Sequence, residues 1–289
     1  MGNETNYNLC DYRTVEALLK KHGFNFSKAL GQNFLIDDEI CPAMAEYLGA
    51  DESTAVIEVG PGIGVLTKEL CKTAGKVAAI ELDKRLYPIL AETLCDYDNF
   101  ELIEGDALKL DLNKLILEHL SGYEEIKFCA NLPYYITSPL IMKLLEERLP
   151  ISEIVVMVQK EAAERLCADM GTRKAGAVTA AVKYYGEAEI LFEVKRESFM
   201  PSPKVDSAVI KISVNGNQKY PVSDEKKFFS LIRAAFAQRR KTLVNSVSAT
   251  LGIQKSEIIN CLSQLSLNPN IRAEELTMED FVSLYGLIF

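Results

Sequence analysis

Residues 55–64, AVIEVGPGIG, pass from a β-branched apolar run straight into three closely spaced glycines. A helical pattern begins at Val65, so we expect the glycines in a turn between a strand and a helix. Doubly wound α/β proteins bind ligands at such turns, at the carboxyl ends of their strands. The third glycine comes one residue too early for the Gly-x-Gly-x-x-Gly pattern that holds a pyrophosphate, and Glu58 precedes the first. The segment predicts a cofactor site, although the turn alone is also compatible with nicotinamide and flavin cofactors.

The sequence around this turn alternates short β-branched runs with helical patterns as far as residue 212, which predicts βα units and a mostly parallel sheet. We expect five parallel strands and then a pair of strands that form an antiparallel hairpin at the sheet edge. The predicted strands cover residues 55–59, 76–81, 100–104, 126–130, 154–158, 188–194 and 205–212. The fold class is therefore α/β, with a Rossmann-like sheet.

The pattern changes near residue 215. Polar residues with Gly and Pro at 215–223 predict a linker, and the sequence beyond it has helical periodicity. Asp224 and Thr277 are candidate N-caps. The predicted helices cover residues 224–238, 242–251, 255–264 and 278–288. We therefore expect a larger α/β domain at 1–219 and a small all-α domain at 220–289.

Acidic residues follow the next two predicted strands. Glu81 comes about 20 residues after the glycines, where a carboxylate accepts hydrogen bonds from the two ribose hydroxyls of a nucleoside cofactor. Asp106 reaches the same edge and is suited to the amine of a cofactor adenine. Each acid alone could be a solvated strand end, but together with Glu58 they indicate one site. Three acids without a phosphate-binding lysine favour a cationic sulfonium cofactor, S-adenosyl-L-methionine.

The fourth predicted strand leads into Asn131-Leu132-Pro133-Tyr134, which indicates the reaction class. An exocyclic adenine amine is a poor nucleophile, because its lone pair is delocalised into the ring. The Asn131 side-chain oxygen and the backbone carbonyl that follows, at Leu132, can accept hydrogen bonds from both amine hydrogens and direct the lone pair toward a methyl donor. Pro133 stiffens the turn, and Tyr134 offers a ring on which a flipped-out base stacks.

The composition limits the possible partners and compartments. The 289 residues carry a formal charge of −9, which argues against non-specific nucleic-acid binding over the whole surface. Seven cysteines without a Cys-x-x-Cys pair predict reduced, mostly buried thiols. The two histidines lack metal-ligand spacing, so we predict no metal. Apolar runs are of strand length and the N-terminus is polar, so we expect no membrane contact and a cytoplasmic location.

Four motifs are spread over most of the chain, at residues 31–35 (GQNFL), 58–64 (EVGPGIG), 131–134 (NLPY) and 199–207 (FMPSPKVDS). Together they resemble the ribosomal RNA adenine dimethyltransferases, a family that includes bacterial dimethyladenosine transferase and the macrolide-resistance methylases. The resemblance implies a cofactor site formed by Asn33, Leu35, Gly60, Gly62, Glu81, Asp106 and Asn131. It also implies that Phe199 forms the opposite wall of the base pocket, although a plain core phenylalanine is an equal alternative.

Residues 235–243, AFAQRRKTL, resemble the housekeeping branch of this family more than the resistance branch. That branch dimethylates two adjacent adenosines in the 3′-terminal hairpin of 16S rRNA, in the small ribosomal subunit or its precursor. Tyr135 departs from the family pattern, since many relatives have Asn there, and leaves the shape of the base pocket open. The alternatives are a resistance-type 23S rRNA methyltransferase, a DNA adenine or protein glutamine methyltransferase, and a mainly non-catalytic ribosome assembly factor.

Basic residues concentrate late in the chain, where residues 201–250 hold nine basic and three acidic side chains. A local positive charge of this kind suits RNA phosphates, so we expect the helical domain to bind RNA. The candidate phosphate contacts are Lys160, Arg165, Arg173, Lys174, Arg233, Arg239, Arg240 and Lys241. Each could equally be a solvated surface residue. No long exposed apolar repeat suggests a partner, so we expect a monomer.

Overall fold

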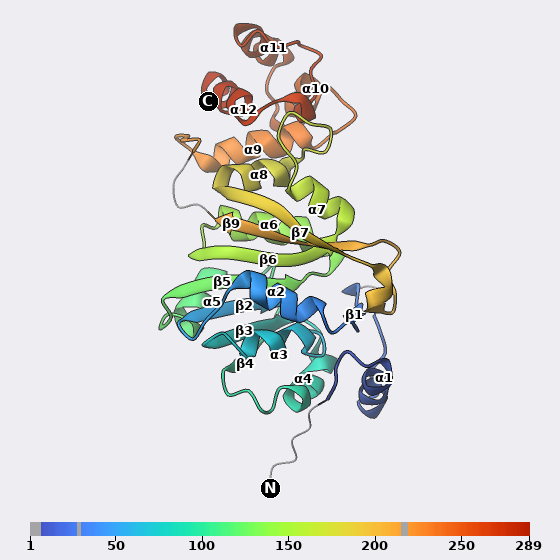
Figure 1. Ribbon diagram of the computed structural model, residues 1–289. Coiled ribbons are helices and arrows are strands. Elements are labelled where there is room, and N and C mark those ends of the chain that lie inside the picture. Colours follow the sequence, from blue (N-terminus) through green and yellow to red (C-terminus); the bar gives the residue numbers. More distant parts are fainter. Residues whose placement is uncertain (1–6, 28–29, 215–218) are drawn as a thin grey trace. The chain divides into compact units, whose positions relative to one another are not determined.

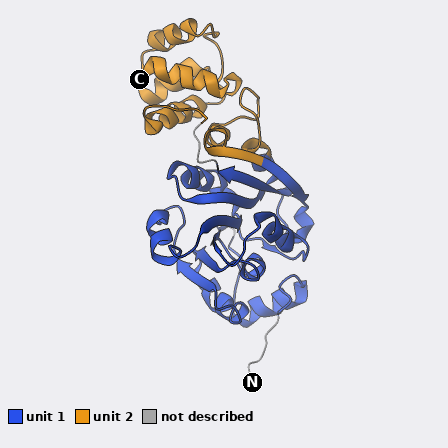
Figure 2. Ribbon diagram, turned by 60° about the vertical axis from the view of Figure 1, so that its left-hand side comes forward, with its two compact units in different colours: residues 1–163, 189–214 blue, residues 164–188, 215–289 orange. Residues whose placement is uncertain are grey.

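The computed structural model describes residues 7–27, 30–214 and 219–289, which form two compact units (Figure 2). Unit 1 contains the described residues up to Ala163 together with Glu189–Val214, and unit 2 contains Glu164–Ala188 together with residues 219–289. Residues 164–188 thus pack with the C-terminal helices. Part of the predicted linker, residues 215–218, lies outside the described residues. The division into functional domains at 1–219 and 220–289 stays a prediction.

Unit 1 is built on a seven-stranded sheet in the order β4-β3-β2-β5-β6-β9-β7 (Figure 1). The strands β4, β3, β2, β5 and β6 are parallel, and β9 runs antiparallel to β6. Their bounds are β2 Thr54–Val59, β3 Lys76–Glu81, β4 Phe100–Glu104, β5 Glu125–Asn131, β6 Ile151–Gln159, β7 Gly186–Val194 and β9 Ser207–Val214. The α/β fold class and the five parallel strands are confirmed, and β7 and β9 are neighbours at the sheet edge.

The register of the parallel strands determines which residues meet at the carboxyl edge. Val59 of β2 pairs with Ile80 of β3, and Glu81 pairs with Glu104 of β4. The residues that follow these strands therefore lie next to one another. The strand order also reverses at β2, whose two neighbours are β3 and β5, and a doubly wound sheet binds its ligand at such a reversal.

Helices cover the sheet, with α2 and α3 on one face and α5 and α6 on the other (Figure 1). The strand β2 is buried at all six positions, as expected of a parallel strand that is covered on both sides. On the α2 and α3 side, the core contains Met44, Leu48, Leu70 and Val155. The helices here are α1 Tyr12–Lys21, α2 Ile40–Leu48, α3 Val65–Cys71, α4 Tyr87–Thr93, α5 Leu112–His119, α6 Thr137–Glu146 and α7 Lys160–Leu166, of which α7 continues into unit 2.

A second, two-stranded sheet joins segments that are far apart in the sequence. β1 (Phe34–Leu35) pairs antiparallel with β8 (Phe199–Met200), so that Leu35 lies opposite Phe199. Neither segment was predicted to be a strand, because two residues carry no recognisable periodicity. Short 3₁₀ helices complete the unit at η2 Lys84–Leu86, η3 Tyr134–Ile136 and η4 Arg196–Ser198.

Unit 2 is helical, and its helices are close to those predicted. They are α8 Ala177–Tyr185, α9 Glu225–Phe236, α10 Leu243–Leu251, α11 Lys255–Gln264 and α12 Met278–Ile288, with a 3₁₀ turn at η5 Ala273–Glu275. Both predicted N-caps are confirmed, because Asp224 accepts from the Lys227 N–H and Thr277 from the Asp280 N–H. The helix α8, which was not predicted, packs on α9 through an aromatic cluster of Tyr184, Tyr185, Phe228 and Phe229.

The cysteines are free, as predicted, and four of the seven are buried, namely Cys41, Cys71, Cys129 and Cys261. Burial raises the pKa of the Cys71 thiol to about 12, so that thiol stays protonated at neutral pH. Within the described part of the chain, no helix has both the length and the apolar character needed to span a membrane.

Candidate active site

A cavity of about 370 Å³ opens at the carboxyl edge of the sheet, entirely within unit 1. Its volume is within the range of about 300–1,000 Å³ that is usual for small-molecule sites. All eleven predicted site residues line it: Asn33, Leu35, Gly60, Gly62, Glu81, Asp106, Asn131, Leu132, Pro133, Tyr134 and Phe199. The described lining residues include neither Lys nor Arg. The structure thus brings the predicted residues together, while their individual roles stay predictions.

The glycine turn forms one wall of the cavity. Gly60, Gly62 and Gly64 all have positive φ angles, which L side chains rarely adopt. A Cβ atom on Gly62 would lie 3.2 Å from two ring carbons of Phe34 in β1. Gly62 therefore allows the backbone of the turn and the N-terminal strand to approach closely.

Glu81 lies at the end of β3 and is almost fully buried. Its Oε1 atom accepts a hydrogen bond of 2.7 Å from the Asp83 N–H. Burial raises the pKa of this carboxyl, and the backbone N–H groups of Asp83, Gly62 and Leu82 partly oppose that shift. The carboxylate is thus held in one orientation, as an acceptor for ribose hydroxyls has to be.

Asp106 follows β4 on the same edge. Its Oδ1 atom accepts from the Leu108 N–H at 3.0 Å, and Oδ2 lies 3.3 Å from the ammonium group of Lys109. The preceding Gly105 donates its N–H to the carbonyl of Glu81 at 3.0 Å, which connects the two strand ends. The two carboxylates therefore belong to one hydrogen-bonded edge of the sheet.

Glu58, the third acid, is fully buried, and its Oε2 atom has no hydrogen-bond partner among the described residues. Burial raises the pKa of this carboxyl to about 8, although the neighbouring Thr67 hydroxyl opposes the shift. At neutral pH the carboxyl is therefore mostly uncharged.

The cavity offers hydrogen-bond acceptors to a ligand. Because Glu58 lines the cavity, its unpaired oxygen can accept a hydrogen bond from a ligand donor such as an ammonium group. This oxygen, the two strand-end carboxylates and the lack of basic lining residues fit S-adenosylmethionine.

The Asn-Leu-Pro-Tyr tetrapeptide is held by backbone bonds at both ends. Asn131 is the last residue of β5 and pairs with Met157 of β6. The Leu132 N–H donates to the Met157 carbonyl at 3.1 Å, and the Pro133 carbonyl accepts from the Ile136 N–H at 3.1 Å. The buried Leu132 side chain anchors the turn in the core. The Asn131 side chain is therefore presented to the cavity from a fixed backbone.

Two aromatic residues line the cavity beyond Asn131. The Tyr134 hydroxyl lies 2.9 Å from the Ser207 hydroxyl, and burial raises the pKa of Tyr134. Phe199 lies in β8 opposite Leu35 and is 4% exposed, so it belongs to the hydrophobic core as well as to the lining. Its role as a wall of the base pocket stays a prediction. Tyr135 also lines the cavity and is half exposed, with its ring beside Gly31.

A side-chain cluster that was not predicted from the sequence holds the N-terminal segment against the strand ends. Gln32 donates to Asp83 at 2.8 Å and accepts from the Ser27 N–H at 2.8 Å. Arg85 binds the same Asp83 carboxylate through two nitrogens, at 2.8 and 2.6 Å, and holds the pKa of that carboxyl below its usual range. Gln32 was visible within the GQNFL motif and Asp83 two residues after Glu81, but nothing in the sequence indicated their contact.

Comparisons with known proteins agree with this geometry. The profile of the ribosomal RNA adenine dimethylase family matches residues 23–288. A ribosomal RNA small subunit methyltransferase A from Geobacillus thermodenitrificans is 49% identical over 275 residues, which cover 94% of each chain. The protein of the same name from Clostridioides difficile is 45% identical and covers 97% of this chain and 96% of its own.

Solved structures give the same result for the fold. A dimethyladenosine transferase from Plasmodium falciparum is 28% identical with a TM-score of 0.67, and the match covers 86% of this chain and 95% of that one. The 23S rRNA methyltransferase ErmE shares the fold, with a TM-score of 0.63 and 24% sequence identity. The match covers 89% of this chain and 99% of that one. This chain belongs to the ribosomal RNA adenine dimethylase family and is a methyltransferase that uses S-adenosylmethionine as its methyl donor.

Proposed function

We propose that this chain dimethylates N6 of two adjacent adenosines in the 3′-terminal hairpin of 16S rRNA, in the small ribosomal subunit or its precursor. The observation that carries the proposal is that Asn131, the two aromatic residues and the carboxylates of the cofactor edge all line one and the same cavity. The names of the relatives from Geobacillus and Clostridioides, which cover nearly the whole chain, support the small subunit as the target.

We assign to the chain's own residues the task of positioning the adenine amine for methyl transfer. Asn131 Oδ1 and the Leu132 carbonyl accept the two hydrogens of the adenine amine, so that its lone pair points into the cavity. Bound S-adenosylmethionine supplies an electrophilic methyl group. Pro133 has no N–H and therefore cannot place a competing donor at this position. Holding the amine in line with the methyl donor supplies most of the rate enhancement, and neither a metal ion nor a covalent intermediate is required.

The aromatic residues are assigned to the base. The Tyr134 ring and Phe199 form opposite walls, between which the flipped-out adenine stacks. The cavity lining includes apolar side chains such as Leu30, Ile63 and Leu108, and we assign to this cavity the space for an amine that already carries one methyl group. This arrangement favours two successive transfers to the same nitrogen.

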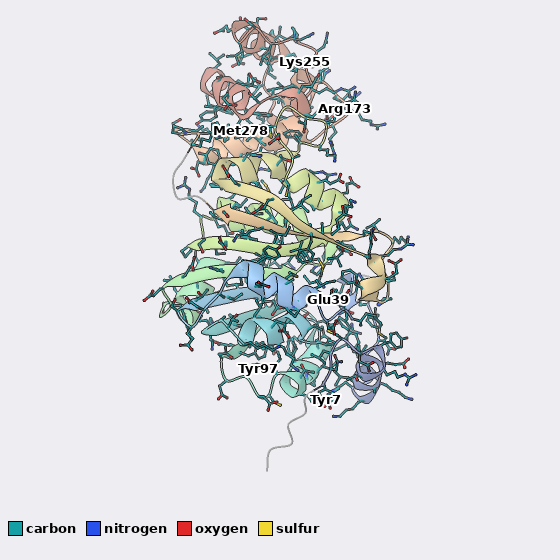
Figure 3. All side chains as sticks on the ribbon, viewed as in Figure 1. Tyr7, Glu39, Tyr97, Arg173, Lys255 and Met278 are labelled. Carbon is teal, nitrogen blue, oxygen red and sulfur yellow. The ribbon has the colours of Figure 1, made fainter. Side chains whose placement is uncertain are left out.

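An exposed basic cluster in unit 2 supports RNA binding. We use the term basic cluster for Arg173, Arg239, Arg240 and Lys241, all of which are exposed (Figure 3 labels Arg173). The Arg239 guanidinium donates to the Arg173 carbonyl at 3.0 Å, so the two arginines are neighbours. Two other candidate contacts are paired with carboxylates, Lys160 with Glu193 at 2.6 Å and Lys174 with Glu164 at 2.8 Å. We therefore assign RNA phosphate contacts to the basic cluster first.

The test is methyl transfer from labelled S-adenosylmethionine to small and to large ribosomal subunits, assayed separately, from a strain that lacks this modification. Nucleoside analysis of the small-subunit RNA is expected to give N6,N6-dimethyladenosine, and mass spectrometry of RNase fragments is expected to place it at two adjacent positions. Label confined to large-subunit RNA would instead assign the protein to the resistance-type enzymes. Cofactor binding without label in any RNA would favour the assembly-factor alternative.

A further inference from the structure

The segment from Lys195 to Ser207 carries the FMPSPKVDS motif, of which only Phe199 has so far been given a role. The two ends of this segment are tied together by Asp206. Its Oδ1 atom accepts from the Arg196 N–H at 3.1 Å, and Oδ2 lies 3.4 Å from the Lys195 ammonium group. The Asp206 carbonyl accepts from the Lys160 N–H at 3.0 Å, next to the end of β6. The segment is therefore a closed loop fixed to the main sheet.

One end of the loop fixes Phe199. The Ser198 carbonyl accepts from the Ile36 N–H at 2.9 Å, and the Ser198 hydroxyl donates to Asp37 at 2.8 Å. Phe199 itself pairs with Leu35. These contacts place one aromatic side chain of the cavity.

The other end of the loop reaches the second aromatic side chain. Ser207 begins β9, pairs with Gln159 of β6 and has no exposed surface. Its hydroxyl lies 2.9 Å from the Tyr134 hydroxyl, across 73 residues of sequence. Both aromatic walls are thus held by one loop, Phe199 through its backbone and Tyr134 through a side-chain hydrogen bond.

We propose that Ser207 is a positioning residue that holds the Tyr134 ring in place for stacking on the target adenine. The inference rests on the function proposed above. The Tyr134 hydroxyl oxygen lies on the Cβ–Cγ axis, so rotation about χ2 leaves it in place, whereas rotation about χ1 moves it away from Ser207. The hydrogen bond holds the far end of the ring to a strand that is itself paired with β6. Ser207 touches neither the base nor the cofactor in this assignment and acts only through Tyr134.

The test is a double-mutant cycle of Ser207→Ala and Tyr134→Phe, measured as kcat/KM for methyl transfer to unmodified small subunits. Ser207→Ala is expected to lower kcat/KM by about 2- to 10-fold, the worth of one hydrogen bond, and Tyr134→Phe by a similar factor. The double variant is expected to be no slower than the slower single variant, and cofactor affinity to stay unchanged in all four proteins. If the two losses multiply in the double variant, Ser207 does not act through Tyr134 and the proposal is overturned.

Ser202→Ala is the matched control, because Ser202 is exposed on the same loop and donates only to backbone carbonyls there, those of Arg196 and Pro203. Its expected kcat/KM is that of the wild type.

A second measurement does not depend on RNA. NMR spectra of the protein with ¹³C-labelled tyrosines report on Tyr134 directly, and its signal is identified because it disappears in Tyr134→Phe. Ser207→Ala should shift this signal, because the ring loses the hydrogen bond that holds its far end. If the wild type methylated no RNA, the proposed function would fail, and an unchanged Tyr134 signal would separately overturn the anchoring.

Discussion

The cofactor side and the base side of the cavity are built in different ways. On the cofactor side, Gly60, Glu81 and Asp106 each lie at or within two residues of the end of a strand, and parallel pairing of β2, β3 and β4 brings them together. On the base side, Tyr134 and Phe199 come from distant segments that meet through β1, β8 and one side-chain hydrogen bond. The cofactor side therefore depends on sheet register, and the base side on individual long-range contacts.

This difference predicts different kinetic effects on the two sides. Substitutions at the strand ends should act mainly on the KM for S-adenosylmethionine, because the backbone that carries them stays in place. Substitutions on the base side should act on kcat or on the KM for RNA. Asn131 lies where the two sides meet, so it provides the strongest test.

Asn131→Ala is expected to have the largest effect. The variant removes the side-chain acceptor of the amine, so kcat should fall by about 100- to 1,000-fold, the usual cost of a preorganised polar group at a reacting centre. Single-turnover methyl transfer at saturating cofactor measures this loss. Asn113→Ala, an exposed substitution in α5, is the control and should behave as the wild type. A variant with normal kcat and only a raised cofactor KM would assign Asn131 to the cofactor side alone.

Glu81→Gln comes next in size. Loss of a charged acceptor for the ribose hydroxyls should raise the KM for S-adenosylmethionine by about 10- to 100-fold and leave the KM for RNA unchanged. Glu104→Gln is the matched control, since Glu104 ends the adjacent strand β4 but is exposed and contacts Lys84. Equal effects of the two substitutions would show that general charge, and not the ribose contact, is responsible.

Gly62→Ala tests whether the two sides are linked through Phe34. The added methyl group would lie 3.2 Å from the ring and would require a positive φ, at a cost of about 1–3 kcal/mol in stability. We expect a lower Tm in thermal unfolding and a smaller rise in cofactor KM than in Glu81→Gln. Gly122→Ala has open space around its Cβ position and should leave Tm unchanged. If Gly62→Ala had an unchanged Tm, the turn would tolerate a side chain and the close approach to β1 would not matter.

Glu58→Gln should change turnover least, by about 2- to 3-fold at pH 7, because the carboxyl is already mostly protonated there. Its effect lies in the pH dependence of stability. Between the ordinary pKa of 4.5 and the raised value of about 8, the folded state keeps a proton that the unfolded state has lost. The stability that this proton contributes is present below pH 4.5 and is lost as the pH rises toward 8. Thermal unfolding from pH 5 to pH 8 should thus show a steeper fall in Tm for the wild type than for the variant, and parallel curves would contradict this.

The same comparison explains how far the sequence could predict the molecule. The strand ends were predicted to within a few residues, and Glu81 and Asp106 followed from them, because parallel pairing is a regular pattern. Asn131 and Tyr134 followed from the chemistry of a tetrapeptide that comes directly after a strand. The contacts of Ser207 with Tyr134 and of Gln32 with Asp83 could not be predicted, since they span 73 and 51 residues and depend on loop paths that have no period. Inclusion of residues 164–188 in unit 2 likewise depends on aromatic packing that local patterns do not encode.

The pairing of β1 with β8 also sets an order of events during translation. Leu35 meets Phe199 only after the ribosome has added about 160 further residues, which takes roughly 8 to 30 s at ordinary elongation rates. The strands β2, β3 and β4, with their glycine turn and carboxylates, leave the ribosome well before that. The strands that carry the cofactor-side residues are therefore available for pairing early, whereas Phe34 and Leu35 have no strand partner until residues 199 and 200 have been synthesised. A chain that ends before residue 199 lacks β8, and therefore lacks both the strand partner of β1 and the residue assigned to one wall of the base pocket.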